Sequence, residues 1–248
     1  MRHNMNDIIT IVWKELKELW RARGSLRARL LSYLPILLIF GVFLPLQEPD
    51  AWIEGPLAGV FSMILPFILA GAAVADSFAG ERERHTLETL LATRLSDRDI
   101  FLGKVLAVVI YSVGLAWACV LLSLITLNIT QGWGSFFMYS GSTLAMTVVG
   151  SILSSLLTTA IGVFVSLKAA SVRAAAQIFS LVTLVLFVGG PLLLRALPDS
   201  AKAWIAQTLS DGNATLIGIA AALIVLVVDI VLLALGIARF QRTRLILQ

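Results

Sequence analysis

Few side chains in this sequence could carry out enzyme chemistry. The single cysteine, Cys119, lies in an apolar run, so neither an intramolecular disulfide nor a cysteine-rich metal site is possible. The two histidines, His3 and His85, lie in charged segments and leave none in the apolar runs for a nucleophilic triad or a zinc site. The sequence has no phosphate-binding G-x-x-x-x-G-K-S/T loop and no H-E-x-x-H pair. These absences argue against an intramembrane enzyme, and they predict that this chain holds no cofactor and hydrolyses no ATP.

Asp229 is the one carboxylate well inside an apolar run. A charge at the centre of a membrane helix costs about 2.5–3.5 kcal/mol, so this side chain should face protein or water, or be neutral. Either it bonds to a neighbouring helix, or it lines a transport path or carries a proton. Bonding is favoured because no second buried charge accompanies it.

Hydroxyl side chains recur at every fourth residue of another apolar run: Thr143, Thr147, Ser151, Ser155 and Thr159. Small and hydroxyl residues on one stripe let helix backbones approach closely. We therefore expect this stripe to pack against another helix. The alternative is a polar translocation path lined by Thr147, Ser151 and Ser155.

The elements that position these residues are membrane spans. The 248-residue chain is 58% hydrophobic and 14% charged, whereas soluble domains are about 25% charged. Six runs are nearly free of charge: 30–46, 55–75, 105–127, 136–167, 174–194 and 214–238. Lipid-embedded backbone must satisfy its own hydrogen bonds, so each run should be a helix. The sequence predicts an all-α integral membrane protein with six transmembrane helices.

The basic residues predict how the chain is oriented in the membrane. Of the 19 Lys and Arg, all except Arg195 and Lys202 fall in segments on one side of the six spans. The positive-inside rule places that side, with both termini, in the cytoplasm of a multi-pass protein of the cell membrane. The net charge of +4 then reflects orientation and implies no nucleic-acid partner. The expected division is a cytoplasmic segment 1–29, a six-helix domain 30–238 and a basic tail 239–248.

Residues 6–21 have the pattern of an amphipathic helix. Its apolar stripe holds Ile8, Val12, Leu16 and Leu19, and is widened by Ile9, Trp13 and Trp20. Such a helix can lie in the plane of the bilayer surface. A lipid anchor alone and an elbow that also contacts a cytoplasmic partner both stay open.

The loop between spans two and three, residues 80–104, is the most informative stretch. Its leucines form an i, i+3, i+4, i+8 stripe: Leu87, Leu90, Leu91 and Leu95. Carboxylates crowd the start of the loop, and Ser96 with Asp97 is typical of the cap of the next helix. A solvated hairpin would explain the charges, but a short helix with one apolar face also suits docking in a groove on a cytoplasmic motor.

This loop resembles that of type 2 ABC exporter permeases, which reads roughly E-x-E-x-G-T-L-E-x-L-L-x-T/S-P-L/V-S. The residues in register are Glu81, Glu83, Thr86, Leu87, Glu88, Leu90, Leu91, Thr93, Leu95 and Ser96. The chain departs at His85, where Gly is frequent, and at Arg94, where Pro is common. The segment 14–19 is similar to the elbow helix of the same family.

The resemblance implies a compact six-span exporter fold, called type V, that works with other subunits. Two cytoplasmic ATPases would bind ATP and Mg, and a second copy or a homologous permease would complete the path through the lipid bilayer. The implied ATPase-coupling residues are Glu81, Glu83, His85, Thr86, Leu87, Glu88, Leu90, Leu91 and Leu95. The implied elbow-helix residues are Val12, Trp13, Leu16, Leu19 and Trp20.

The connection between spans five and six predicts short outer helices. Gly189–Gly190–Pro191 should break the fifth helix, because proline lacks an N–H donor and glycine weakens the turn. A short helix should then start at 198–200. The pair resembles the re-entrant outer helices of the exporter family, and a plain interfacial loop is the alternative.

The sequence thus predicts the transmembrane permease subunit of an ABC exporter. The alternative is a secondary transporter or channel-like protein that uses Asp229, although such proteins usually carry several intramembrane ionisable residues. A haem-exporter-type permease of cytochrome c maturation shares the six-span plan, but the loop fits the general exporter permeases better.

Overall fold

The computed structural model describes residues 5–21, 25–83, 95–131, 136–169, 171–210 and 214–239, and these contain helices without strands. The α-helices are α1 (Met5–Arg21), α2 (Leu26–Leu38), α3 (Leu44–Gln47), α4 (Pro49–Ile53), α5 (Leu57–Val74), α6 (Gly80–Glu83), α8 (Asp97–Gln131), α9 (Gly141–Ala145), α10 (Ser151–Lys168), α11 (Val172–Leu184), α12 (Gly190–Ala196), α13 (Asp199–Ser210) and α14 (Ala214–Arg239). Four π-helical segments continue them: η1 (Ile39–Phe43), η2 (Ala75–Ala79), η3 (Met146–Gly150) and η4 (Val185–Gly189).

The helices that could cross a membrane match the expected spans. Five are long and apolar enough by themselves: Leu30–Gln47, Leu57–Ala79, Asp97–Gln131, Gly141–Ser166 and Leu216–Arg239. The remaining expected span is formed by α11, which is 13 residues long, followed by η4 and α12. The prediction of an all-α integral membrane protein is confirmed.

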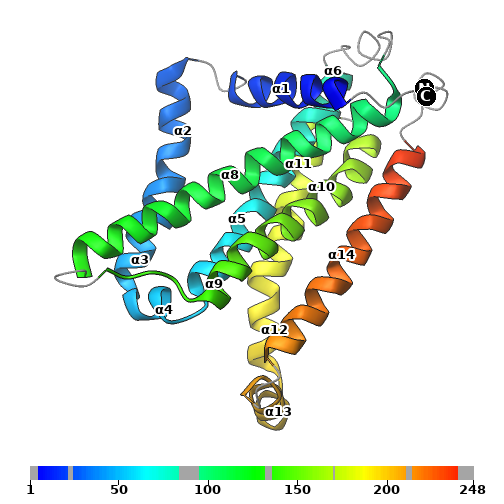
Figure 1. The fold of residues 1–248 in the computed structure, drawn as a ribbon. Coiled ribbons are helices and arrows are strands. Elements are labelled where there is room, and N and C mark those ends of the chain that lie inside the picture. The colour runs from blue at the N-terminus through cyan, green and yellow to red at the C-terminus, as the bar shows by residue number, and fades with distance from the viewer. Residues whose placement is uncertain are drawn as a thin grey trace.

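The centre of the bundle is formed by α5, α8 and α10 (Figure 1). Glycine lets these helices approach closely: a Cβ on Gly162 of α10 would overlap Val74 of α5. Gly150, just before α10, faces Met63 of α5 in the same way, since a Cβ there would lie 2.7 Å from Met63 Cγ. An added side chain at Gly162 would push α10 away from α5, whereas one at Gly150 would displace the flexible Met63 side chain.

Hydroxyl groups of the predicted stripe join α10 to α8. Ser155 Oγ and Ser112 Oγ are 2.7 Å apart, and Trp117 Nε1 donates to Ser151 Oγ at 3.0 Å. Thr147 is buried, and its hydroxyl has no hydrogen-bond partner among the described residues. The contacts of Ser151 and Ser155 are those expected of helix packing.

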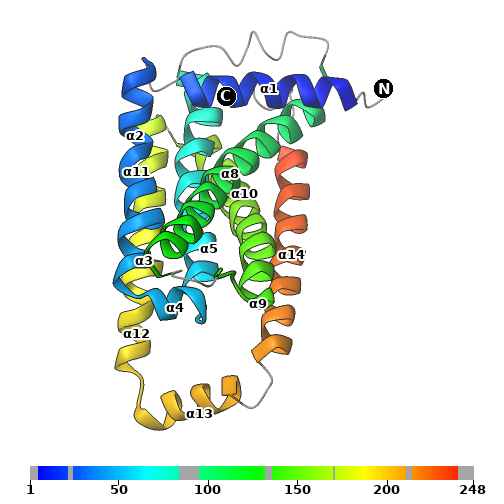
Figure 2. The ribbon, with the colours of Figure 1, turned by 60° about the vertical axis from the view of Figure 1, so that its left-hand side comes forward.

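Two helices lie across the opposite ends of the bundle, and the helices between them have apolar sides. The helix α1 lies across one end of the bundle, against α8 and close to α6 (Figure 1). At the opposite end α13 lies across the space between α12 and α14 (Figure 2). The sides of α11, α12 and α14 carry many exposed leucine, isoleucine and valine side chains, as expected of surfaces that meet lipid or another apolar chain.

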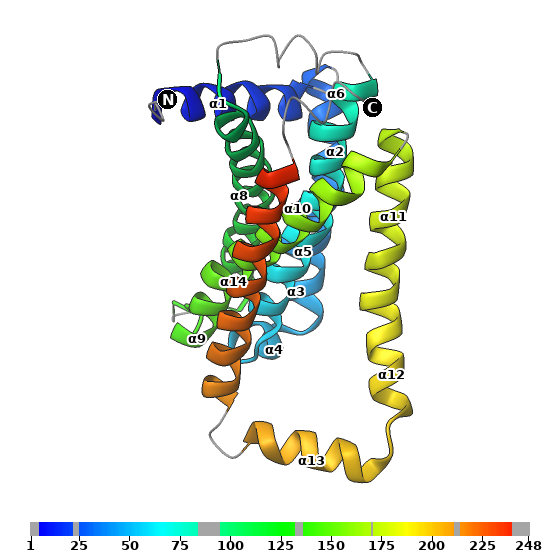
Figure 3. The same ribbon diagram turned by 90° about the vertical axis from the view of Figure 1, so that its right-hand side faces the viewer.

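The expected break at Gly189–Gly190–Pro191 is wrong. The chain stays helical through η4 into α12, which continues in the direction of α11 (Figure 3). Pro191 is the second residue of α12, and Gly190 alone separates it from the π-helical segment η4, so the missing N–H is accommodated at the start of α12. The helix ends instead at Ala196, with Leu197 extended before Pro198, and α13 runs crosswise without turning back into the bundle. The re-entrant pair is therefore not seen.

Candidate functional site

The predicted docking hairpin is described only at its base. Residues 84–94 lie outside the described residues, and with them six of the implied coupling residues: His85, Thr86, Leu87, Glu88, Leu90 and Leu91. The two segments that flank this gap, 80–83 and 95–104, are called the hairpin stem below. The stem shows how the hairpin is fastened to the bundle.

The return side of the stem begins with a helix cap. Ser96 Oγ accepts a hydrogen bond from the backbone N–H of Asp99 at 3.1 Å, so Ser96 caps α8 as the sequence predicts. The Asp99 carboxylate also bonds to the Ser96 hydroxyl and is buried. Leu95, just before the cap, packs against the main core. The start of α8 is thus held in place by local contacts.

A fully buried lysine lies at the centre of the site. Lys104 of α8 is 0% exposed, and its Nζ lies 2.9 Å from Glu15 Oε1 and 2.9 Å from Glu81 Oε1. The same ammonium donates to the backbone oxygen of Ser77 at 3.0 Å. Glu15 Oε2 in turn accepts from Ser77 Oγ at 2.7 Å. One cation therefore ties together the elbow helix α1, the outgoing side of the stem and α8.

A second lysine completes the group, and Lys14, Glu15, Glu18, Glu81 and Lys104 are called the ion cluster below. Lys14 Nζ lies 3.2 Å from Glu15 Oε1, 3.2 Å from Glu81 Oε1 and 3.4 Å from Glu18 Oε1. Lys14 and Glu18 are partly exposed, whereas the other three side chains are buried. The cluster thus runs from the surface to the interior.

The surroundings of the two α1 charges favour ionisation. Burial alone would raise the pKa of Glu15, but Lys104, the Ser77 hydroxyl and Lys14 outweigh it and hold the pKa below the ordinary value of 4.5. Burial alone would lower the pKa of Lys14, but Glu15, Glu81 and Glu18 raise it well above the ordinary value of 10.5. Both groups are therefore charged at neutral pH.

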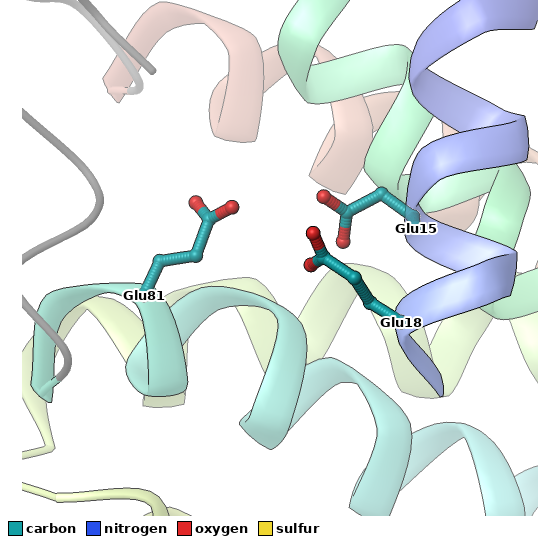
Figure 4. Close-up of side chains that lie close together, drawn as sticks. All are labelled: Glu15, Glu18 and Glu81. Atoms are coloured by element: carbon teal, nitrogen blue, oxygen red, sulfur yellow. The ribbon is translucent and has the colours of Figure 1, made fainter. Parts of the chain in front are cut away.

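The three carboxylates of the cluster come close together, as Figure 4 shows. One oxygen from each of Glu15, Glu18 and Glu81 lies within 4.8 Å of the others. Such a group can hold a metal ion, but here the ammonium groups of Lys14 and Lys104 already contact these oxygens. The arrangement is an ion-pair network, so we assign no metal to it.

The elbow helix presents two different apolar faces. Ile11 and Leu19 are buried against the bundle, and a Cβ on Gly103 of α8 would lie 2.6 Å from Ile11 Cγ2. The predicted residues Val12 and Leu16 are half-buried, whereas Trp13 and Trp20 are 70% and 56% exposed. The exposed tryptophans suit the bilayer surface, and the buried face holds α1 on α8.

Another carboxylate fastens the stem to the fifth span. Glu83 Oε2 accepts a hydrogen bond from the backbone N–H of Val172 at 3.0 Å. Val172 is the first residue of α11, where N–H groups lack partners within the helix and a negative charge is favourable. The outgoing side of the stem is thus joined to α1 and α8 through Glu81 and to α11 through Glu83.

Sequence reasoning included Glu81 and Glu83 but missed Glu15 and Lys104 as members of one site. A signal was present for Glu15, because it continues the stripe of Ile8, Ile11 and Leu19 at helical spacing. A charged residue on the buried face of a helix requires a partner of opposite charge. Asp229 lies elsewhere, on α14, and so does the hydroxyl stripe, on α9, η3 and α10.

Comparison with known proteins places the chain in a family. Residues 6–209 match the family model described as ABC-2 type transporter. The chain is also similar to the ABC transporter permease protein NatB of Bacillus subtilis (strain 168), with 32% identity over 55% of this chain and 39% of the relative. The matched region thus spans well under half the length of that relative. The family match covers most of the chain and agrees with helices long and apolar enough to cross a membrane, so the chain is a transmembrane permease of the ABC-2 type transporter family.

Proposed function

We propose that this chain is the membrane half of an ATP-driven exporter, and that separate cytoplasmic ATPase subunits dock on the hairpin 84–94. The chain carries no phosphate-binding loop of its own, so ATP and Mg would be held by the partner. The observation that carries the proposal is the fastening of the stem: Glu81 bonds to Lys104, and Glu83 bonds to α11. If the stem held in this way is displaced, α1, α8 and α11 are displaced with it.

The mechanism follows from these contacts. Movement of the docked ATPases would shift the hairpin, and the ion cluster would make α1 and the start of α8 follow it. The bond from Glu83 would move the start of α11 in the same direction. A difference in ATP affinity between two states of the assembly would supply the energy for the change in access.

The distribution of charge supports a cytoplasmic position for the stem. Lys14, Lys17 and Arg98 lie on helices at the end that carries the stem, whereas Arg195 and Lys202 lie toward the opposite end. This asymmetry favours a cell-membrane protein with both termini inside. The exposed apolar sides of α11 and α14 leave room for lipid and for a second permease, either a copy or a homologue.

The docking proposal is tested by placing charges on the leucine stripe. Replacing Leu87→Asp together with Leu91→Asp should abolish co-purification of the ATPase subunit, because charges buried without partners disfavour the complex. The matched control is Thr89→Asp with Thr93→Asp, which places two charges at the same spacing on the opposite face of the predicted helix. Both variants should reach the membrane normally. Equal recovery of the ATPase with wild type and with the leucine variant would overturn the proposal.

A further inference from the structure

Asp229 is a buried carboxyl group without a bonding partner. The side chain is 1% exposed, and neither oxygen has a hydrogen-bond partner among the described residues. Both oxygens are fully enclosed by protein atoms, so no water-sized space adjoins either of them. A buried ionised carboxylate requires donors or a counter-ion, which these residues do not supply.

The depth of Asp229 follows from two contacts of α14. Gly236 lies against the ring of Phe101 in α8, and Arg239 lies over the ring of Phe164 in α10 at 5.7 Å. Asp229 precedes Arg239 by ten residues, or about 15 Å of helix, and Ser155 precedes Phe164 by nine, or about 13 Å. Asp229 is therefore near the level of the Ser155–Ser112 contact, inside the bundle.

The hydroxyl groups near this level already have other partners. Thr158 and Thr159 donate to the backbone oxygens of Ser154 and Ser155, at 2.9 and 2.7 Å. Ser151 accepts from Trp117, and Ser155 shares its hydrogen bond with Ser112. In this arrangement they supply no donor to Asp229.

Among the described residues, no charged group on the neighbouring helices neutralises Asp229 either. In that part of the chain, α14 packs mainly against α10, and also against α8 and α13. Their titratable residues are Asp97, Arg98, Asp99, Lys104, Tyr111 and Cys119 of α8, Lys168 of α10, and Asp199 and Lys202 of α13. Lys104 is held by Glu15 and Glu81, and the Tyr111 hydroxyl contacts that of Tyr33 at 3.0 Å. Asp97, Arg98 and Asp99 open α8, Lys168 is the last residue of α10, and α13 lies wholly beyond the outer end of the bundle (Figure 2), so none of these is at the level of Asp229. The Arg239 side chain lies over Phe164.

We propose that Asp229 is a proton-binding site: its carboxyl group is protonated in this conformation and exchanges its proton when α14 separates from α8 and α10. A proton needs no space beyond that of the carboxyl group itself, whereas a hydrated cation or an organic ligand does. Water that enters between the helices would then let the acid ionise. This inference does not depend on an ATPase partner.

The protonated state is tested by infrared spectroscopy of the permease alone in lipid nanodiscs at neutral pH. The wild type should show the C=O stretching band of a neutral carboxylic acid, and Asp229→Asn should lose it while keeping the shape of the side chain. The matched control is Asp199→Asn, because the side chain of Asp199 is 100% exposed. A wild type without the band, or a band that persists in Asp229→Asn, would overturn the assignment.

Proton exchange is tested by transfer of the same samples to heavy water. A Cβ on Gly236 would lie 2.8 Å from Phe101, so Gly236→Val should push α14 away from α8 and speed the deuterium shift of the band several-fold. Gly218 has no atom within 4 Å of such a Cβ, so Gly218→Val is the matched control and should exchange like the wild type. Equal rates in Gly236→Val and Gly218→Val would show that helix separation does not govern the exchange, and would overturn that half of the proposal.

Discussion

Two carboxyl groups of this protein are equally buried but have opposite surroundings. Glu15 is 2% exposed and Asp229 is 1% exposed. Glu15 contacts two lysines and a serine hydroxyl, whereas Asp229 has no hydrogen-bond partner among the described residues. Glu15 lies on α1, which crosses one end of the bundle, and Asp229 lies within the membrane span of α14. Near the end of the bundle a buried charge is retained with partners, and within the span we infer a neutral acid.

The presence or absence of partners decides whether each carboxyl group holds structural elements in place. A paired ionic group fixes the relative position of the elements that supply its members, here α1, the hairpin stem and α8. A carboxyl group without partners fixes nothing, and its state depends on whether water reaches it. The ion pairs of Glu15 suit the transmission of movement between α1, the stem and α8. The unpartnered Asp229 suits a change of protonation when helices move.

Removing the Lys104 ammonium should have the largest effect on the free energy of unfolding, because it takes away the buried cation that pairs with Glu15. Lys104→Met keeps the bulk of the side chain but leaves the buried Glu15 and Glu81 short of a partner, and should lower the free energy of unfolding by about 3–5 kcal/mol. Thermal and denaturant unfolding of the purified chain in detergent measure this change. The control is Lys202→Met, which removes an exposed pair with Asp199 and should cost about 1 kcal/mol or less. Similar losses in the two variants would contradict the central role of Lys104.

Neutralising the Glu15 carboxylate should lower the free energy of unfolding by an intermediate amount that depends on pH. Glu15→Gln keeps the shape of the side chain but loses its charge, at an expected cost of about 1–3 kcal/mol at neutral pH. The pKa of Glu15 in the folded chain lies below 4.5, so the unfolded state binds more protons as the pH falls through that region. The stability that this charge contributes is therefore present above pH 4.5 and lost below it.

Unfolding free energies of wild type and Glu15→Gln, compared from neutral pH downward, test this sign. The difference between the two proteins should shrink as the pH falls below 4.5. A difference that stays constant, or grows, as the pH falls would show that the Glu15 charge is not stabilised by its neighbours.

Removing the unpartnered carboxyl group should have the smallest effect on stability. Asp229→Leu replaces it by an apolar group of similar size and breaks no hydrogen bond seen in the described residues. The free energy of unfolding should therefore stay unchanged or rise by about 1 kcal/mol. A loss as large as that of Lys104→Met would show that Asp229 has a strong partner, and would remove the contrast with Glu15.

The sequence predicts those features of the fold that depend on local pattern. Apolar runs must become helices in lipid, and Ser96 is followed at the right spacing by an amide that it can cap. The ion cluster was not predictable in this way, because Lys104 and Glu15 are 89 residues apart in the sequence. Their meeting depends on how α1 lies on α8, where Ile11 packs closely against Gly103.

The outer connection was mispredicted for a related reason. Gly189–Gly190–Pro191 contains residues that weaken a helix, but a helix can continue through them when a π-helical segment precedes the proline. Local helix propensity alone does not say whether the helix breaks at these residues or continues through them. The coupling residues in 84–94 and the path residues of the stripe stay predictions.

In the proposed mechanism, the elbow helix and the start of α8 move together when the ATPases change state. The test uses spin labels in the assembled transporter, at the exposed positions Lys17 of α1 and Arg98 of α8, with Cys119 replaced by alanine. A second pair joins Lys17 to Lys202 of α13 at the opposite end. Binding of ATP should leave the 17–98 distance unchanged and alter the 17–202 distance, and Lys104→Met should make the 17–98 distance variable. A 17–98 distance that changes with ATP in the wild type as much as the 17–202 distance would contradict the account.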